Sequence, residues 1–282
     1  MKILVIGLGQ LGKDLLRVLR SSHEVAGLDV PDVDITRAES LEAALEAHAP
    51  DLVINAAAYT DVERAEEDEA TAYAVNATGA GLLAEATAAR GIPIVLYSTD
   101  FVFDGKKGSD YVPEDVPAPL SVYGASKLAG EIATAQANPK HYIMRTAWLY
   151  GPGGNNFIEK IIGWAQQLDS LRVVTDEVGS PTHTWDVAEA TGRLIATEAY
   201  GVYHVVNQGV CSRFDLAQAV IESLSLDVGL NECLSSEFPT KAERPEYSVL
   251  DCTSLEAVCG EPMPEWRETL ERYLVRRTNV TA

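Results

Sequence analysis

The sequence predicts an α/β fold, in which a doubly wound parallel sheet carries a smaller α/β lobe. Three observations support this prediction. Short apolar runs alternate with longer helical stretches up to about Thr146, a glycine-rich turn follows the first apolar run, and the regular alternation then breaks off. Strands that are apolar throughout are typical of a parallel sheet covered by helices on both faces.

The apolar runs give the expected strands, and the stretches between them give the helices. Strands are predicted at 3–6, 25–28, 52–54, 94–97 and 142–144, and later at 172–174 and 203–206. Helices are predicted at 11–21, 37–47, 68–90, 122–137 and 157–168. Thr36 and Glu39 have the spacing of a capping box for the second helix, and Gly91 with Pro93 ends the third. This order of elements predicts right-handed crossovers between parallel strands.

Composition excludes several classes of function. With 282 residues, 46% of them hydrophobic, the chain is long enough for a substantial core and too apolar to be disordered. Its 42 acidic and 22 basic residues give a formal charge of −20, which repels nucleic acid and anionic membrane surfaces. The N-terminus reads as a strand rather than a signal peptide, and no run approaches the ~20 apolar residues of a membrane span. We therefore expect a cytoplasmic protein without nucleic-acid or membrane partners, and reduced thiols at Cys211, Cys233, Cys252 and Cys259.

A Gly-x-Gly-x-x-Gly turn, Gly7-Leu8-Gly9-Gln10-Leu11-Gly12, joins the first expected strand to the first helix. Glycines at these positions let the backbone approach a pyrophosphate at a helix N-terminus. The next strand ends in Leu28-Asp29, where a carboxylate can accept hydrogen bonds from an adenosine ribose. The sequence therefore predicts a Rossmann-like dinucleotide site for NADH or NADPH. NADH is favoured, because Asp29 would repel a ribose 2′-phosphate.

Tyr123 and Lys127 form a Tyr-x-x-x-Lys pair on an expected helix, where side chains four residues apart share one face. A tyrosine with its ordinary pKa near about 10 is a poor acid–base group at neutral pH unless a nearby ammonium stabilises the phenolate. Lys127 is placed to lower the pKa of Tyr123 in this way. Together with the glycine turn, the pair predicts proton transfer beside the cofactor.

Hydroxyl groups stand at the end of a central strand, in Tyr97-Ser98-Thr99-Asp100. Ligands of open α/β sheets bind over that edge, so a hydroxyl here can contact the substrate oxygen at the reacting carbon. Consecutive strand residues point to opposite faces. Ser98 and Thr99 cannot both serve without a bend, and the spacing leaves the choice open.

These motifs predict how the chain is divided. Residues 1–150 are expected to form a dinucleotide-binding domain, to which 164–175 and 186–207 return. Residues 151–163, 176–185 and 208–282 are expected to form a substrate-binding lobe over the C-terminal edge of the sheet. Gly151–Asn156 is expected to be a loop rather than a linker, because a helix and further strands follow it.

Motifs across nearly the whole chain together resemble the extended short-chain dehydrogenases/reductases. Besides the glycine turn and the Tyr-Lys pair, they are Asn55-Ala56-Ala57-Ala58-Tyr59-Thr60, Ser98–Gly105, Arg145–Gly151, Gly179-Ser180-Pro181-Thr182, and Arg244-Pro245 with Ser248 and Leu250. The resemblance implies an NAD(P)H-dependent oxidoreductase acting on a nucleotide-diphosphate keto sugar. Most narrowly, it implies reduction of the 4-keto group of dTDP-4-dehydro-L-rhamnose to dTDP-L-rhamnose in nucleotide-sugar biosynthesis, and we expect a monomer or homodimer.

The resemblance also implies roles for single residues. Thr99 would be the catalytic hydroxyl, Tyr123 the acid, and Lys127 its partner and a ribose ligand. The cofactor would contact the glycine turn at Gly7, Gly9, Gln10, Leu11 and Gly12, the ribose carboxylate Asp29, the adenine neighbours Asp34 and Ile35, and Ala57, Ala58, Tyr59, Tyr97, Tyr123 and Lys127. The sugar nucleotide would contact Thr99, Asp100, Tyr123, Trp148 and Arg244.

For three residues a structural role is an open alternative. Trp148 could pack in the core or lobe, and Arg244 could form a surface ion pair instead of binding the diphosphate. Asn76 matches an Asn that supports the catalytic helix in the superfamily, or it packs helices together.

The chain departs from the family pattern at several positions. The glycine turn is one residue shorter than the usual Gly-x-x-Gly-x-x-Gly, Phe101 stands where Tyr is frequent, and Glu177 where Gln is common. Some family members bind magnesium through acidic residues at an interface. Asp14 is the only matching position here, so no metal is expected.

Two other interpretations remain. The chain could be another nucleotide-sugar reductase or an epimerase, which would retain tightly bound NAD. It could also be a non-catalytic, cofactor-binding regulatory subunit resembling the beta subunit of methionine adenosyltransferase. The intact set of Thr99, Tyr123 and Lys127 favours an enzyme.

Overall fold

Six parallel strands form the central sheet of the computed structural model, which describes residues 1–280. The strands are β1 (Lys2–Ile6), β2 (Glu24–Leu28), β3 (Leu52–Asn55), β4 (Ile94–Thr99), β5 (His141–Thr146) and β10 (Gly201–His204). They lie in the order β10-β5-β4-β3-β1-β2, which confirms the predicted α/β class with a parallel sheet. The order reverses between β1 and β3, so a ligand crevice is expected there.

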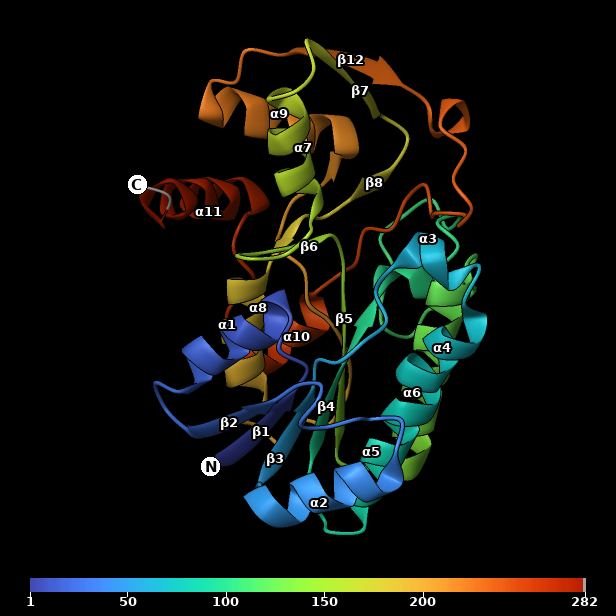
Figure 1. The fold of residues 1–282 in the computed structure, drawn as a ribbon, viewed down its shortest axis with the longest axis vertical. Coiled ribbons are helices and arrows are strands. Elements are labelled where there is room, and N and C mark those ends of the chain that lie inside the picture. Colours follow the sequence, from blue (N-terminus) through green and yellow to red (C-terminus); the bar gives the residue numbers. More distant parts are fainter. Residues whose placement is uncertain (281–282) are drawn as a thin grey trace.

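Helices cover both faces of the sheet. One face carries α1 (Gln10–Leu19), α8 (Thr184–Leu194) and α10 (Thr253–Cys259), and the other carries α2 (Ala38–His48), α5 (Ala80–Ala88) and α6 (Val122–Ala137) (Figure 1). Successive side chains of β1 divide between them: Ile3 and Val5 pack in the core with α1 and α8, while Leu4 and Ile6 pack in the core with α2 and α5. The sheet is therefore buried on both sides.

The helix predicted at 68–90 consists of three consecutive parts. α4 (Glu69–Tyr73) runs into a π-helical segment, η1 (Ala74–Gly79), which continues into α5. The short α3 (Val62–Ala65) precedes them. π turns inside helices are frequent at functional sites. Asn76 lies in this turn and is buried.

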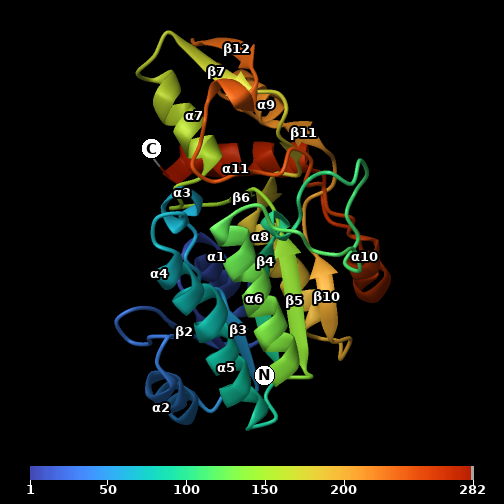
Figure 2. The same ribbon diagram turned by 90° about the vertical axis from the view of Figure 1, so that its right-hand side faces the viewer.

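The smaller lobe lies over the edge to which the arrowheads of β4, β5 and β10 point (Figure 2). Its core is formed by α7 (Phe157–Ala165), α9 (Arg213–Leu224) and α11 (Trp266–Val280), packed with a two-stranded sheet of β7 (Ser170–Val174) and β12 (Gly229–Cys233). Two further short pairs are present: β6 (Leu149–Tyr150) pairs with β9 (Thr182–His183), and β8 (Val178–Gly179) pairs with β11 (Cys211–Ser212). Two 3-10 turns, η2 (Asp100–Val102) and η3 (Ser235–Glu237), complete the described elements.

The strand predicted at 172–174 does not join the central sheet, so the expectation that 164–175 returns to it is wrong. β7 pairs in parallel with β12 inside the lobe. Its residues alternate, with Leu171 and Val173 buried and Ser170 and Arg172 exposed. Such alternation suits a sheet with one solvated face rather than a covered parallel sheet. The other boundaries between the two parts stay a prediction.

The predicted capping box is also wrong. The Thr36 hydroxyl donates a hydrogen bond to Asp34 Oδ1 at 2.7 Å. α2 begins after Arg37, without a side-chain cap. Thr36 therefore stabilises the turn before the helix.

Two further expectations concern the whole chain. All four cysteines are free. Among the helices of residues 1–280, none is long and apolar enough to cross a membrane.

Candidate active site

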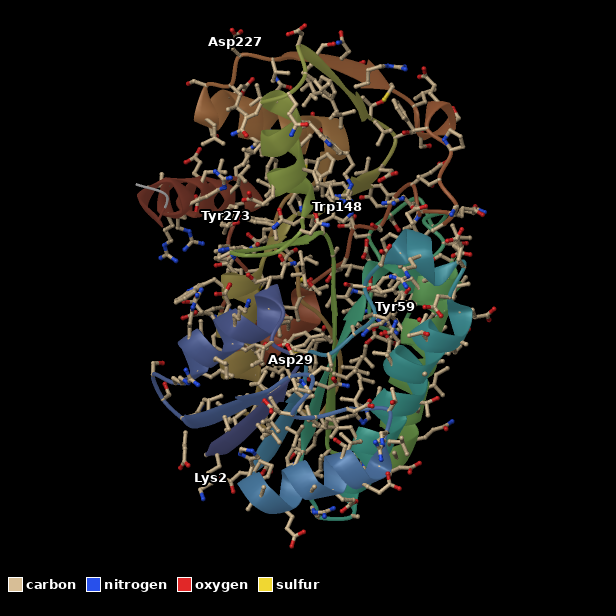
Figure 3. All side chains as sticks on the ribbon, in the orientation of Figure 1. Lys2, Asp29, Tyr59, Trp148, Asp227 and Tyr273 are labelled. Carbon is tan, nitrogen blue, oxygen red and sulfur yellow. The ribbon has the colours of Figure 1, made fainter. Side chains whose placement is uncertain are left out.

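A cleft of about 970 Å³ lies between the sheet edge and the lobe. Nearly all the predicted site residues line it: Gly7, Gly9, Gln10, Leu11, Gly12, Asp29, Asp34, Ile35, Ala57, Ala58, Tyr97, Thr99, Asp100, Tyr123, Lys127, Trp148 and Arg244. Figure 3 shows Asp29 beside the strands and Trp148 near the base of the lobe, so the cleft reaches from one part to the other.

The structure does not place Tyr59 in the cleft. Its N–H donates to Asn76 Oδ1 at 2.8 Å, and its carbonyl oxygen accepts from Asn76 Nδ2 at 3.0 Å. Among the cleft-lining residues of the described chain are Ala57, Ala58 and Thr60, but not Tyr59. The Asn76 amide thus holds this segment so that its alanines, rather than the tyrosine, face the cleft.

The glycine turn has the geometry of a phosphate-binding turn. At Gly7, with φ +93°, a Cβ would lie 2.3 Å from the Ala57 nitrogen, and at Gly12 a Cβ would lie 1.9 Å from the Gly7 oxygen. At Gly9 a Cβ would meet nothing within 4 Å. The first and third glycines therefore pack the turn tightly, while the second leaves open space at the N-terminus of α1 for a phosphate group.

The residues at the ribose end fit a dinucleotide as well. Asp29 follows β2, and its carboxylate accepts from Leu8 N at 3.0 Å and from Val30 N at 2.9 Å. These bonds fix the carboxylate beside the glycine turn. The segment 29–36, from which most residues line the cleft, carries three carboxylates, two of them lining it, and no basic side chain.

The start of α6 packs directly on the end of β4, which brings the predicted catalytic residues together. Ser121 caps the helix, its Oγ accepting from Gly124 N at 3.2 Å. A Cβ at Gly124 would lie 2.2 Å from the Phe101 oxygen, so only glycine permits this approach. As a result, Tyr123 in the first turn lies against the strand end that carries Thr99.

Burial dominates the protonation of the tyrosine and the lysine. It raises the pKa of Tyr123 to about 12, with a smaller contribution from Asp100, while hydrogen bonding from Thr99 opposes the rise. Burial lowers the pKa of Lys127 to about 8, against the effect of Glu131. Lys127 Nζ donates to the Tyr97 carbonyl oxygen at 2.6 Å. The expected lowering of the Tyr123 pKa is therefore not observed, and Tyr123 is a protonated phenol at neutral pH.

Thr99, rather than Ser98, is the hydroxyl coupled to Tyr123. Thr99 Oγ1 donates to Asp100 Oδ1 at 3.0 Å and accepts from Phe101 N at 3.2 Å. Asp100 Oδ2 accepts from Ser248 Oγ of the lobe at 2.6 Å. Burial raises the pKa of Asp100, and its bonds with Ser248 and Thr99 oppose the rise. Ser98 Oγ is buried and has no hydrogen-bond partner within residues 1–280.

Asn76 connects the cofactor side of the cleft to the catalytic helix. Besides its two bonds to Tyr59, Nδ2 donates to Ser126 Oγ at 3.0 Å, and Ser126 Oγ donates to the Tyr123 carbonyl at 2.8 Å. The backbone of Asn76 also packs closely on α6, since a Cβ at Gly130 would lie 2.1 Å from the Asn76 backbone oxygen. Both roles left open by the sequence, support of the helix and close packing, are therefore present.

Two aromatic side chains and an arginine line the cleft next to one another. Trp148 has φ +47°, a conformation that is costly for a residue with a side chain and is found preferentially at functional sites. The Arg213 guanidinium lies 3.5 Å from the centroid of the Trp148 ring and 5.2 Å from that of Phe157. Sequence reasoning missed Arg213 and Phe157, because no local motif marks them and only the folding of the lobe brings them to Trp148.

Arg244 forms the ion pair that the sequence left as one alternative, and its role at the diphosphate stays a prediction. It lines the cleft, and its Nη2 donates to Glu63 Oε1 at 2.7 Å. Glu63 belongs to α3, so this ion pair joins the lobe to the sheet side of the cleft.

No metal centre is found within the part of the chain that the structure describes: no group of three or more His, Cys, Asp or Glu side chains could hold an ion. Asp14 is buried, and its carboxylate accepts from Thr184 Oγ1 at 2.5 Å and from Arg17 Nη1 at 3.2 Å. Its bonds connect α1 to α8.

The chain is similar over nearly its full length to a protein family, to named relatives and to solved structures. Residues 1–279 match the family model described as RmlD substrate binding domain. A dTDP-4-dehydrorhamnose reductase of Mycobacterium tuberculosis (strain H37Rv) is 40% identical over 282 residues, covering 97% of this chain and 92% of the relative.

Two solved structures share the fold closely. A dTDP-4-dehydrorhamnose reductase of Clostridium acetobutylicum superposes with a TM-score of 0.96 at 41% identity, covering 99% of this chain and 100% of the other. The dTDP-4-dehydrorhamnose reductase of Bacillus anthracis str. Ames in complex with NADP gives a TM-score of 0.95 at 36% identity, covering 98% and 99%.

Proposed function

Because the chain belongs to the RmlD substrate binding domain family, we propose that it is an NAD(P)H-dependent oxidoreductase that reduces the 4-keto group of dTDP-4-dehydro-L-rhamnose to dTDP-L-rhamnose. The observation that carries this proposal is the convergence of Thr99, Tyr123 and Lys127 beside a dinucleotide-type glycine turn. Relatives named for the same reaction support it.

The dihydronicotinamide of a bound cofactor supplies the hydride for the keto carbon. Tyr123 holds a proton at its phenolic oxygen, because its pKa is about 12, and donates it to the substrate oxygen as negative charge develops there. An alkoxide is a stronger base than a phenolate, so the transfer is favourable. The Lys127 ammonium, on the same face of α6, stabilises the phenolate that remains.

Thr99 stabilises the same oxygen. Its hydroxyl proton is directed at Asp100 in this structure, and rotation about the side chain turns it toward the substrate oxygen. Asp100 keeps a second donor, Ser248, when Thr99 turns away. The hydroxyl and the phenol then act on the developing charge together.

We propose NADH as the preferred cofactor. Support comes from Asp29, which is fixed beside the glycine turn and carries a negative charge that would repel a 2′-phosphate. The Bacillus anthracis relative was solved with NADP. The two cofactors therefore have to be compared directly.

We propose that the protein acts in the cytoplasm as a monomer or homodimer, without a nucleic-acid or membrane partner. The formal charge of −20 supports this setting, because it opposes association with polyanions.

A panel of keto sugars tests the proposed function. Purified protein is mixed with dTDP-, GDP- or UDP-linked 4-keto sugars and either reduced cofactor, and nicotinamide absorbance is followed. We expect cofactor oxidation with the dTDP-linked sugar. Interconversion of two sugars without added cofactor would instead identify an epimerase, and binding without turnover on any sugar would identify a regulatory subunit.

A further inference from the structure

Arg213 is a guanidinium within the cleft that the proposed reaction leaves without a role. It is the first residue of α9, and its side chain is only 14% exposed. The guanidinium carbon lies over the Trp148 ring, 3.5 Å from the ring centroid, and 5.2 Å from the centroid of the Phe157 ring. Aromatic contact holds a guanidinium by cation–π attraction while its N–H groups stay available at the edge.

The donors of Arg213 are mostly unused. Nε lies 3.4 Å from Glu177 Oε2, a long and weak contact. The two terminal nitrogens have no hydrogen-bond partner among the side chains that the structure describes, and the residue lines the cleft. These nitrogens are not among the fully buried unpaired atoms, so they are open to the cleft, where an anionic ligand can accept their hydrogen bonds.

A second guanidinium, that of Arg244, lines the same cleft. Burial lowers the pKa of Arg213 and the positive charge of Arg244 adds to this effect, while Glu177 and Asp100 act in the opposite direction. Arg244 Nε is buried and lacks a hydrogen-bond partner within the described chain. The two positive charges oppose each other, and an anion that contacts both guanidiniums would reduce this repulsion.

Resting on the proposed function, we propose that Arg213 binds the diphosphate of the sugar nucleotide, together with Arg244. The diphosphate carries the negative charge of such a substrate, and a planar guanidinium can donate two parallel hydrogen bonds to phosphate oxygens. Trp148 orients the guanidinium through its ring face, and Glu177 contacts the nitrogen nearest the chain. The anionic part of the substrate is thereby recognised by cations within an acidic protein.

The test compares two ligands that differ only in the diphosphate. Binding of dTDP and of thymidine is measured by titration calorimetry for wild type, Arg213→Gln and Arg213→Lys, with NADH binding as a check that each variant is folded. We expect Arg213→Gln to weaken dTDP binding by roughly 10-fold or more, since a charge-assisted hydrogen bond is lost, and to leave thymidine binding unchanged. Arg213→Lys should fall between them, because a lysine supplies a charge without the planar fork.

Arg172→Gln is the matched control. Arg172 lies on the lobe surface, paired with Glu237 and 49% exposed, and should bind dTDP like wild type. Equal dTDP affinity in wild type and Arg213→Gln would overturn the role of Arg213 and leave the reductase proposal standing. An equal loss of dTDP and thymidine binding would overturn it too, because the diphosphate would not be the group recognised. A wild type that neither binds dTDP nor reduces any dTDP-linked sugar would overturn the proposed function itself.

Discussion

Lys127 is buried where a charged ammonium is costly, and this sets the pH range in which the site can support proton transfer. Its pKa is lowered to about 8, so the side chain is charged at neutral pH and loses its charge as the pH rises through that value. Tyr123, with a pKa of about 12, stays protonated over the same range. As the pH rises through about 8, Lys127 therefore loses its charge while Tyr123 keeps its proton.

We expect kcat/KM for reduction to be level near neutral pH and to decline above about pH 8, as the phenolate loses its neighbouring cation. Arg keeps its charge throughout this range, so Lys127→Arg should lack this decline in whatever activity it retains. The measurement is kcat/KM against pH at saturating cofactor. A wild-type profile without the decline would contradict this account of Lys127.

Asp29 gives a second prediction at this scale. Asp29→Ala removes the carboxylate that opposes a 2′-phosphate, so the ratio of kcat/KM for NADH to that for NADPH should fall by roughly 10-fold. Asp32→Ala is the control, because Asp32 is exposed and is not among the cleft-lining residues of the described chain. A ratio that does not change in Asp29→Ala would show that selection lies elsewhere.

Residues close in sequence were the predictable part of the site. The residues of the glycine turn have a fixed spacing on a turn, and Tyr123 and Lys127 have a fixed spacing on a helix. Within each motif, the sequence alone therefore shows which side chains lie close together. Arg213 contacts Trp148 only after the lobe folds, and no spacing of residues in the sequence predicts this contact. The pKa of Tyr123 was expected to be lowered by its lysine neighbour, because a sequence shows the neighbour but not the loss of water around the phenol.

Among the elements, α6 depends on its close contact with the π turn. A Cβ at Gly130 would lie 2.1 Å from the Asn76 carbonyl oxygen, and this backbone atom cannot move aside as a side chain can. Gly130→Ala should therefore push α6 away and destabilise the fold by about 1–3 kcal/mol. It should also lower kcat, because α6 carries Tyr123 and Lys127.

Gly163→Ala is the matched control for this substitution. Gly163 also lies within a helix, α7, but a Cβ there would meet nothing within 4 Å. Its replacement should leave stability unchanged or raise it by about 0.5–1 kcal/mol. Denaturant unfolding and thermal melting of both variants measure the difference, and equal effects would refute a specific contact at Gly130.

The strands of the central sheet could be predicted, because they are apolar on both faces. β7 has apolar side chains mainly on one face, and its alternation of Leu171 and Val173 with Ser170 and Arg172 was the signal that it belongs to another sheet. The π turn was not predictable, since the run from 68 to 90 has the composition of a continuous helix. The role of the π turn is seen only in the structure, where Asn76 forms hydrogen bonds with Tyr59 and Ser126.

At the scale of the whole molecule, the two parts are joined across the mouth of the cleft. Glu63 accepts from Arg244 Nη2 at 2.7 Å and from Lys241 N at 2.9 Å, and Glu67 pairs with the Lys241 ammonium. These contacts are not predictable from the sequence, since Glu63 and Arg244 are far apart in the chain. In these contacts, Arg244 and Lys241 pair with acidic side chains on a surface that is otherwise strongly acidic.

The formal charge of −20 predicts how stability responds to salt. Repulsion among exposed carboxylates destabilises the folded chain, and screening shortens its range from about 30 Å at 0.01 M salt to about 8 Å at 0.15 M. The melting temperature should therefore rise over this range, equally in NaCl and KCl. A melting temperature that falls with salt would show that attractive surface pairs outweigh the repulsion.

The central claim is that this chain reduces a dTDP-linked keto sugar with Tyr123 as the proton donor. Its most direct test follows NADH oxidation with dTDP-4-dehydro-L-rhamnose for wild type and Tyr123→Phe, with the product identified by NMR. We predict one dTDP-L-rhamnose formed for each NADH oxidised by wild type, and a kcat lower by roughly 10² or more in Tyr123→Phe with NADH affinity nearly unchanged. Undiminished turnover by Tyr123→Phe, or no reduction by wild type with either cofactor, would contradict the claim.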